Sequence, residues 1–374
     1  MQSSLDAATI ADKVARLDAA IDKSASWLRQ NLPFHAGSYK SPRDDGLIDS
    51  GQYMLLPYAY EKAGRPNAAF DALSHSIEMG GPDGFGCVAP ATLAKGGFIP
   101  YAPSWHAFTL CHFGRPDVAR KILRHVLPYQ ARGAYCGFFD GPRQRDMGDG
   151  VLCFDSSCAA IIACLFAGEL EAAYRGGAYL LRLDDLSTEG ERVWTIRPDG
   201  SAVRGKSDAA WALHSAAPDP VTVCCTSRVD EPNSPHWKSG FYLAACAHLY
   251  SHTGDTRYRD AATKMARFAR ASVDAKGGWL LWGHKLAWGA AELYKVTADE
   301  SALTIADELG EMMMRRQAAD GTFPYREWFP QGDPTRITYS ITAQCLIWMA
   351  KVKEALLMKA RRSGTGAAAI RSRL

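Results

Sequence analysis

Two hydrophobic patterns alternate along the chain. The first is apolar at almost every position and predicts helices at 49–64, 102–113, 154–166, 236–252, 282–296 and 337–352. The second is apolar on one face only and predicts helices at 14–31, 66–79, 115–129, 168–182, 255–272 and 299–316. A helix that is hydrophobic all round must be buried, whereas a one-sided helix covers a core. The alternation therefore predicts six helical hairpins, each made of an inner and an outer helix.

A repeated junction supports this organisation. The stretch "GRPNAAFDAL" at 64–73 returns as "GRPDVARKIL" at 114–123. In each copy we expect Gly to end one helix in a left-handed cap and Pro to occupy the first position of the next helix. Less exact copies begin at Gly168, Gly254 and Thr297. Self-similarity of this kind is the signature of a repeat architecture.

The expected fold is all-α, an (α/α)6 toroid of six helical hairpins that fills a single domain over residues 1–357. An open α-solenoid is the alternative, but fully apolar inner helices favour a closed ring. Residues 184–235 interrupt the rhythm as an insertion, in which "RVWTIRPDGSAV" reads as a short β-hairpin. A connection of this length is either a lid over the cavity or a surface elaboration. Residues 358–374 are expected to form a flexible basic tail.

Composition narrows the class of protein. The chain is 47% hydrophobic and 22% charged, with a net charge of +3. This small, scattered excess does not favour nucleic-acid binding, and no apolar run is long enough for a membrane span. We expect no signal peptide, a cytoplasmic location and ten reduced cysteines, with no metal site because no CxxC pair occurs. The sequence leaves open whether the chain forms a homo-oligomer.

The first turns of the inner helices would line the cavity of a toroid, and aromatic, imidazole and carboxylate groups recur there. We predict catalytic roles for Asp155, His106, Asp49 and Tyr53. We predict substrate contacts for Tyr101, Trp105, Cys136, Cys153, Phe154, His236, Trp237, Trp282, His284, Glu327 and Tyr339. Each also fits a structural role: the rings as packing, His106 as a core histidine, and Asp155 or Asp49 as a helix cap.

Several cofactor motifs are absent from the sequence. There is no Gly-rich phosphate loop, no GxGxxG, no acidic pair typical of terpene cyclases and no GxSxG elbow. We therefore expect no cofactor, and acid–base chemistry on a small-molecule substrate.

The hairpin count and the Gly-aromatic stretches between hairpins resemble the (α/α)6 superfamily. It includes six-hairpin glycosidases, uronyl hydrolases, N-acylglucosamine epimerases and the linalool dehydratase-isomerase type. Within it, "PSWHAFTLCHFGRPDVA" and "YCGFFDG…VLCFDSSCAA" resemble segments of the linalool dehydratase-isomerase group. The resemblance implies that His106, Cys136 and Cys153 face the substrate, with Asp49 and Tyr53 opposite.

Two enzyme hypotheses follow. A third hypothesis is a helical scaffold without catalytic activity, but inward-facing His and acidic residues argue against it. The first is a lyase, isomerase or cyclase for a terpenoid- or polyketide-like substrate, with Asp155 as general acid and His106 as base. Neighbouring inner helices pack ~8–10 Å apart, which lets the two groups bracket one substrate. The second is a glycoside hydrolase or sugar epimerase, with Glu327 or Asp155 as acid. A rim with few carboxylates and many Trp, Phe and Cys side chains favours the first.

Overall fold

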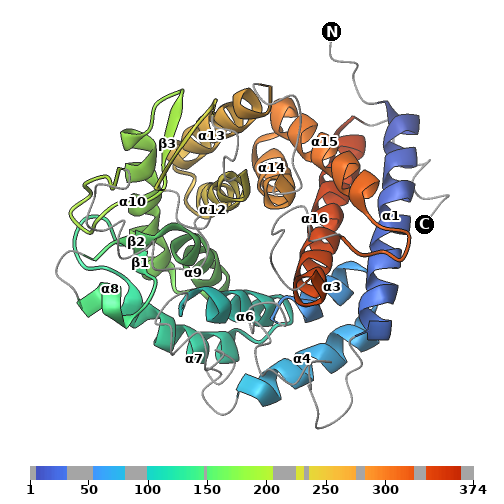
Figure 1. Ribbon diagram of the computed structural model, residues 1–374, viewed down its shortest axis with the longest axis horizontal. Coiled ribbons are helices and arrows are strands. Elements are labelled where there is room, and N and C mark those ends of the chain that lie inside the picture. Colours follow the sequence, from blue (N-terminus) through green and yellow to red (C-terminus); the bar gives the residue numbers. More distant parts are fainter. Residues whose placement is uncertain are drawn as a thin grey trace.

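Helices form two concentric rings in the computed structural model, which describes residues 6–31, 54–80, 99–146, 150–204, 225–230, 236–274, 283–323 and 334–363. The inner helices are α3 (Leu56–Lys62), α6 (Tyr101–His112), α9 (Phe154–Ala167), α12 (His236–Thr253), α14 (His284–Thr297) and α16 (Pro334–Arg362). The outer helices are α1 (Ala7–Asn31), α4 (Pro66–Gly80), α7 (Pro116–Val126), α10 (Leu170–Leu186), α13 (Thr256–Asp274) and α15 (Glu300–Arg316). Figure 1 shows the second set surrounding the first.

The inner ring is closed. Each inner helix contacts the next one along the chain, and α16 returns to contact α3. This confirms the predicted (α/α)6 toroid and rules out the open solenoid. Each predicted helix corresponds to an observed one, but the bounds differ: α1 begins at Ala7 and not at 14, α3 covers only Leu56–Lys62 of the predicted 49–64, and α16 continues to Arg362 and not to 352. The inner helices could be recognised because they are buried on nearly all sides: every residue of α9 except Phe166 is buried.

The repeated junction forms the turn that sequence analysis predicted. Gly64 and Gly114 adopt φ angles of 68° and 71°, a left-handed conformation that glycine reaches without steric cost. The helices that follow begin at Pro66 and Pro116. Proline is tolerated there because the backbone N–H at the first position of a helix has no partner within the helix. In the last hairpin Ala298 takes the same place with φ 60°. One turn geometry therefore reverses the chain at the same end of the ring each time.

Two glycines let α12 and α14 approach each other closely. A Cβ atom on Gly240 would lie 2.2 Å from the carbonyl group of Lys285, and one on Gly289 would lie 2.2 Å from the Gly240 oxygen. No side chain fits at such distances, so backbone meets backbone here. This contact fixes the spacing of two neighbouring inner helices.

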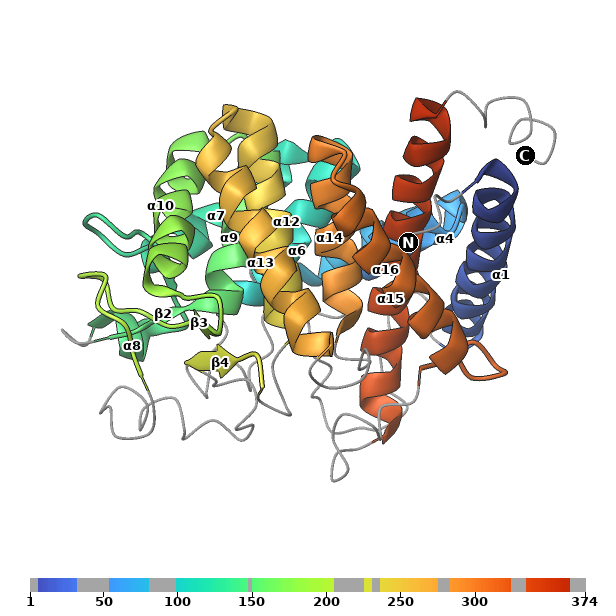
Figure 2. The same cartoon turned by 90° about the horizontal axis from the view of Figure 1, so that it is seen from above.

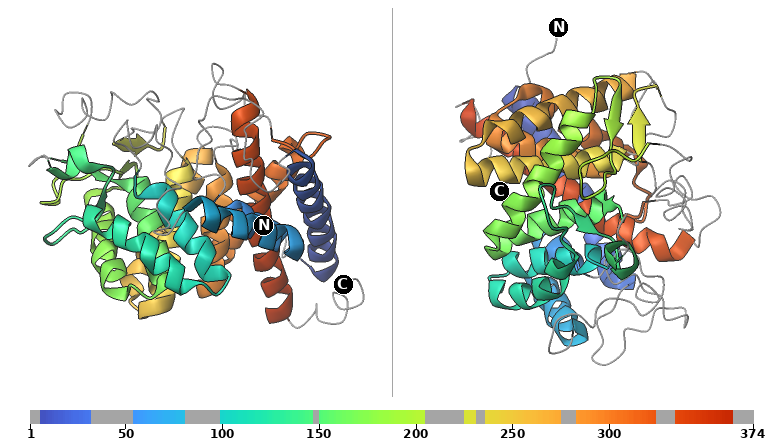
Figure 3. Two further views of the ribbon diagram at one scale, coloured as in Figure 1. Left: turned by 90° about the horizontal axis from the view of Figure 1, so that it is seen from below. Right: turned by 90° about the vertical axis from the view of Figure 1, so that its left-hand side faces the viewer.

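Short strands gather at the other end of the helices, where outer helices lead into inner ones. They are β1 (Phe138–Phe139), β2 (Leu152–Cys153), β3 (Glu191–Val193) and β4 (Thr226–Arg228), accompanied by η1 (Leu127–Tyr129) and α8 (Pro142–Asp146). Figures 2 and 3 show α8 and the strands together at this end. We call it the mouth of the ring.

The insertion and the tail differ in detail from expectation. Within the insertion, β3 pairs with β4 in antiparallel register, while the predicted hairpin is reduced to a single bridge between Ile196 and Ala202. The helix α16 continues to Arg362, so a tail begins later than position 358. The eight cysteines that the structure describes are free thiols. No helix among the described residues is long and apolar enough to cross a membrane.

The glycine contact between α12 and α14 gives a stability prediction. We expect Gly240→Ala to lower the free energy of unfolding by about 2 kcal/mol or more, because the new methyl group overpacks the interface and forces the helices apart. Gly190→Ala is the matched control, since a Cβ at Gly190 meets nothing within 4 Å, and it should change stability by no more than about 0.5 kcal/mol. Denaturant unfolding measures both. Equal effects of the two substitutions would contradict the account.

Candidate functional site

Two buried carboxyl groups lie on adjoining segments of the mouth. Asp140 directly follows β1, and Asp155 lies in the first turn of α9, directly after β2. The strands pair with Phe138 opposite Cys153, which brings the two segments together. The hydroxyl of Ser156 donates a 2.9 Å hydrogen bond to Asp140, so that carboxyl group sits against the start of α9. Only 6% of Asp140 and 5% of Asp155 is exposed.

Asp155 is held in an environment that favours its protonated form. Burial raises the pKa of its carboxyl group, and the positive charges of Lys238 and Lys285 offset only part of that effect. Among the described residues none forms a hydrogen bond to its Oδ1 atom. A carboxylic acid in such a place can donate a proton at a pH where an exposed one has already lost it.

Two lysines lie near Asp155 at the starts of the next inner helices. Lys238, in the first turn of α12, is 2% exposed and lies over the Phe154 ring at 5.8 Å. Lys285, in the first turn of α14, donates a 3.3 Å hydrogen bond to the hydroxyl of Tyr101 on α6. The mouth thus combines a buried acid with cationic hydrogen-bond donors contributed by neighbouring helices.

Aromatic rings fill the inside of the ring below these groups. Trp105 packs against Trp288 at 5.6 Å between ring centroids, and Trp288 stacks on Trp348 at 4.5 Å. Phe241 contacts both Trp105 and Trp288. Trp105 is 2% exposed, so this predicted substrate contact packs in the core.

His106 points toward the outer layer rather than toward Asp155. Its Nε2 atom lies 3.1 Å from the hydroxyl of Ser76 on the outer helix α4. Burial lowers the pKa of the imidazole to about 4. The structure therefore places His106 between the two rings of helices, as a neutral core histidine, and does not bring it together with Asp155.

The two predicted cysteines lie in different surroundings. Cys153 lies beside both carboxyl groups, and burial, with the charges of Asp140 and Asp155, raises the pKa of its thiol. Cys136, just before β1, donates to the Gly133 carbonyl oxygen at 2.9 Å and contacts Arg175 of the outer helix α10.

On the remaining inner helices, the Phe154 ring packs on Trp194 at 5.0 Å. His284 is 1% exposed and pairs with Gln344 at 3.3 Å, while Trp237 is buried in the first turn of α12. Asp49, Tyr53, Trp282 and Glu327 lie outside the described residues, as do the side chains of His236 and Tyr339.

Three residues of this mouth received no role from the sequence. Asp140 ends the stretch "CGFFD", in which we predicted a role for Cys136 alone. Lys238 and Lys285 belong to the helix starts where we looked for aromatic and acidic groups. Their position in the first turns of apolar inner helices was the available signal. Among the described residues no group of three His, Cys, Asp or Glu side chains is arranged to hold a metal ion.

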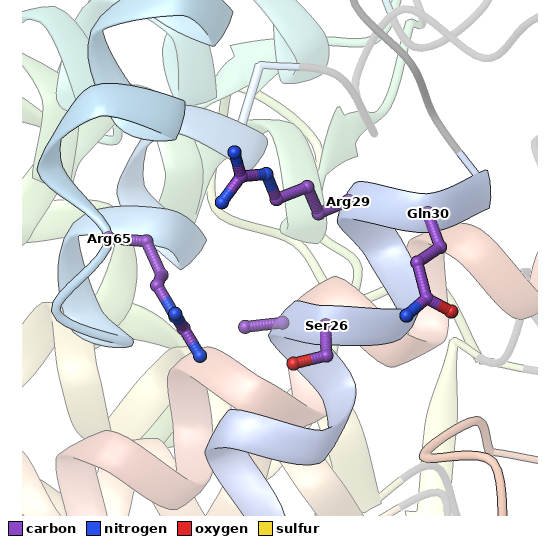
Figure 4. Close-up of a pocket in the computed structure, with 5 residues that line it drawn as sticks. Ser26, Arg29, Gln30 and Arg65 are labelled. Carbon is purple, nitrogen blue, oxygen red and sulfur yellow. The ribbon is translucent and has the colours of Figure 1, made fainter.

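A separate pocket lies on the outer wall, between α1 and the turn that leads into α4. Its volume is about 420 Å³, and it is lined by Ala25, Ser26, Arg29, Gln30 and Arg65. Figure 4 shows the two arginine side chains extending from different elements toward the same gap. Arg65 also forms an ion pair with Asp22. This pocket shares no residue with the mouth.

Comparison with known proteins identifies the fold. No protein-family model and no curated protein matches the chain. A GH76 α-mannanase from Bacteroides thetaiotaomicron superposes with a TM-score of 0.62 and 14% identity, over 91% of this chain and 97% of that one. A second structure is a GH76A α-1,6-mannanase from Salegentibacter sp., inactivated at two consecutive aspartates and bound to α-1,6-mannotriose. It superposes with a TM-score of 0.60 and 14% identity, over 91% of this chain and 99% of that one.

A third solved structure is an unsaturated glucuronyl hydrolase variant with the oligosaccharide dGlcA-Glc-Rha-Glc. It gives a TM-score of 0.61 and 15% identity, over 94% of this chain and 98% of that one. At such identities the likeness shows a shared (α/α)6 toroid. It supports the expected resemblance to (α/α)6 toroid proteins in fold, whereas the finer resemblance to the linalool dehydratase-isomerase type finds no support.

The predicted chemistry needs correction. The expectation of a lyase, isomerase or cyclase for a terpenoid substrate is wrong, because the three solved structures described above, which share this toroid, are glycoside hydrolases. They favour the carbohydrate-active alternative. The earlier preference depended on a count of polar groups at the rim, and that count omitted Asp140 and both lysines.

The buried histidine gives a pH prediction. In the unfolded chain His106 should titrate near ~6.5, whereas its pKa in the folded protein is about 4. Between these two pH values the unfolded state therefore binds more protons than the folded state. The contribution of His106 to the free energy of unfolding is complete above pH ~6.5 and decreases by about 3 kcal/mol in total as the pH falls toward 4.

We expect His106→Gln to flatten the pH dependence of the free energy of unfolding in this window, whatever it does to stability at neutral pH. His252→Gln removes an exposed histidine from the end of α12 and controls for the loss of an imidazole. Unfolding measured from pH 7 to pH 4 tests this. An unchanged slope in His106→Gln would show that the residue is not held neutral by burial.

Proposed function

We propose that the chain is a carbohydrate-active enzyme that hydrolyses glycosidic bonds at the mouth of the toroid. The observation that carries this proposal is the pair of buried carboxyl groups, Asp140 and Asp155, at the end of the ring where inner helices begin. Glycoside hydrolases commonly use two carboxyl groups, one as proton donor and one as base or nucleophile. The shared toroid of the mannanases and the glucuronyl hydrolase supports the same class.

The two acids differ in environment, and that difference assigns their roles. Asp155 has a raised pKa because it is buried, and it protonates the departing glycosidic oxygen. Asp140, which accepts a hydrogen bond from Ser156, acts as the carboxylate that activates water or attacks the anomeric carbon. Two titratable groups whose environments differ are the usual basis of an acid–base pair.

The cationic groups at the mouth position the sugar. Lys285 and Lys238 each carry several N–H donors, which suit hydroxyl or carboxylate groups of a saccharide. Tyr101 holds the Lys285 ammonium group by a 3.3 Å hydrogen bond and presents a ring beside it. A sugar epimerase with a two-histidine relay is less well supported, since His106 bonds to the outer helix and His284 bonds to Gln344.

The proposed pair differs from the consecutive aspartates substituted in the Salegentibacter mannanase. This chain has two such dipeptides, Asp44–Asp45 and Asp184–Asp185. The first lies outside the described residues. In the second, Asp184 is bonded to Arg192 at 3.1 Å and to Lys264 at 2.7 Å at the end of an outer helix. We therefore assign no catalytic role to Asp184, and Asp44–Asp45 enters the test below.

The test is hydrolysis of two substrates, α-1,6-mannotriose and an oligosaccharide that ends in an unsaturated uronate. The reducing ends that are released measure the turnover. We expect Asp155→Asn and Asp140→Asn each to lower turnover by about 100-fold or more, since each loses a positioned proton donor or acceptor. Asp146→Asn is the control, because Asp146 lies in the same connection, exposed and paired with Arg145. Circular dichroism verifies that each variant is folded.

Folded Asp155→Asn protein with wild-type turnover would contradict the assignment of the acid. Loss of turnover in Asp44→Asn or Asp45→Asn, with both proposed acids dispensable, would move the catalytic pair to that dipeptide. Failure of the wild-type protein to cleave any glycoside in a wider panel of sugars would contradict the proposed function itself.

A further inference from the structure

At the end of the ring opposite the mouth, one side chain from each inner helix joins a closed circle of contacts. In order around the ring these residues are Tyr58, His112, Phe166, His248, Glu292 and Lys351. We call this circle the collar. The hairpin turns that surround it all belong to the described residues. The mouth chemistry does not use any of its members.

Aromatic contacts form one half of the collar. The Tyr58 ring stacks on His112, with centroids 4.5 Å apart and planes 23° apart. His112 contacts Phe166 at 5.1 Å, and Phe166 contacts His248 at 5.2 Å. His112 also packs against Phe108, yet it is exposed to solvent. The imidazole is thus surrounded by rings while one edge remains accessible.

Ion pairs form the other half. Lys351 lies 3.2 Å from Glu292 and 3.4 Å from Glu354, while Lys295 contacts the same two carboxylates at 2.7 Å and 3.2 Å. Lys62 contacts Glu354 at 3.0 Å. Burial alone would raise the pKa of each glutamate, but the lysines hold both values below the usual range. The two carboxylates are therefore ionised and already engaged by three ammonium groups.

The buried part of this cluster carries one excess positive charge. Lys62 has one further acidic contact, Glu61 at 3.4 Å, but 47% of the Glu61 side chain is exposed. Such an exposed ion pair is weak because water screens it. The uncompensated charge lies close to His112: after the burial effect, Lys351 and Lys62 are the neighbours that most lower the pKa of its imidazole.

Hydrogen-bond donors outnumber acceptors on this side of the collar, where Glu292 and Glu354 are the carboxylates that the lysines contact. The hydroxyl of Tyr58 is fully buried. Lys351 interacts with this hydroxyl, but no described residue accepts the hydroxyl proton in a well-oriented hydrogen bond. The ammonium groups of Lys62 and Lys351 lie 5.2 Å and 5.6 Å from the centroid of the Tyr58 ring. The exposed imidazole of His112 stacks on the same ring. A phenol, an imidazole and two ammonium groups together suit an anion with several acceptor oxygens.

We propose that the collar is a binding site for a small oxyanion, a phosphate or carboxylate group, held by Lys62, His112 and Tyr58 with Lys351 behind them. The bound anion compensates the excess charge, and its oxygens accept from the hydroxyl of Tyr58 and the imidazole N–H group. This site is separate from the mouth, so it stands whether or not the proposed hydrolase activity does.

The probes are inorganic phosphate and acetate, compared with chloride at equal ionic strength. We expect one or both to shift the imidazole NMR signals of His112 in a saturable way. Lys62→Met should weaken that binding by about tenfold or more, because it removes a charge-assisted bond. His112→Phe preserves the ring packing and removes the N–H donor, so it should weaken binding while the protein remains folded.

Lys353→Met is the matched control. Lys353 lies two positions from Lys351 on α16 but pairs with Asp18 of the outer helix α1, so its loss changes net charge without touching the collar. Phosphate and acetate affinities measured by calorimetry should match those of the wild type in this variant. Equal weakening in Lys353→Met and Lys62→Met would indicate a nonspecific charge effect and contradict the proposal.

The arginine pocket on the outer wall is the competing anion site on this chain, and Arg29→Met tests it. Binding lost in Arg29→Met and retained in Lys62→Met would place the anion there and overturn the proposal. Absence of saturable binding of either probe would also overturn it, and would leave the collar as a brace that closes the ring.

Discussion

The architecture depends on one constraint, which is that the inner helices have almost no polar face. A helix such as α9, buried at every position except Phe166, is stable only when other helices cover it on all sides. Closing six such helices into a ring and surrounding them with six amphipathic ones satisfies this requirement. Polar chemistry is then confined to the two ends of the ring, where the inner helices begin and where they end.

The two ends are joined by a continuous column of ring contacts. Tyr101 at the mouth contacts Trp105, Trp105 contacts Phe108, and Phe108 contacts both Tyr58 and His112 of the collar. An aromatic interior of this kind separates the charged groups of the two ends, and burial against it disfavours their charged forms. Burial raises the pKa of Asp155 at one end and lowers that of His248 to about 4 at the other.

The fold could be predicted because its signals are local. The repeated Gly-Arg-Pro junction specifies a left-handed turn and a helix start, and the structure has that turn at Gly64 and Gly114. Apolar inner helices and one-sided outer helices were visible in the sequence for the same reason: burial leaves a pattern. Asp155, in the first turn of an apolar helix, is buried for the same reason.

The site was harder to predict because it depends on direction and on pairing across the ring. A helix that is apolar all round gives no signal of which face looks inward, so His106 could not be told from its neighbour Trp105, although one contacts the outer layer and the other the interior.

Asp140 follows a strand of two residues whose partner lies beyond α8, and no sequence period reveals such a pairing. The collar has the same difficulty. Lys351 and Glu292 look like isolated charges in apolar helices until the ring closes and brings them within 3.2 Å.

The central claim is that a buried carboxylic acid at the mouth remains protonated where an exposed aspartate would be ionised. The most direct measurement is the pKa of Asp155 itself, from carbon-13 NMR of the carboxyl group, with Asp155→Asn used to assign the signal. The account predicts a value clearly above the ~3.9 of a free aspartate. A value at or below that reference would mean that Lys238 and Lys285 outweigh burial, and it would contradict Asp155 as the proton donor.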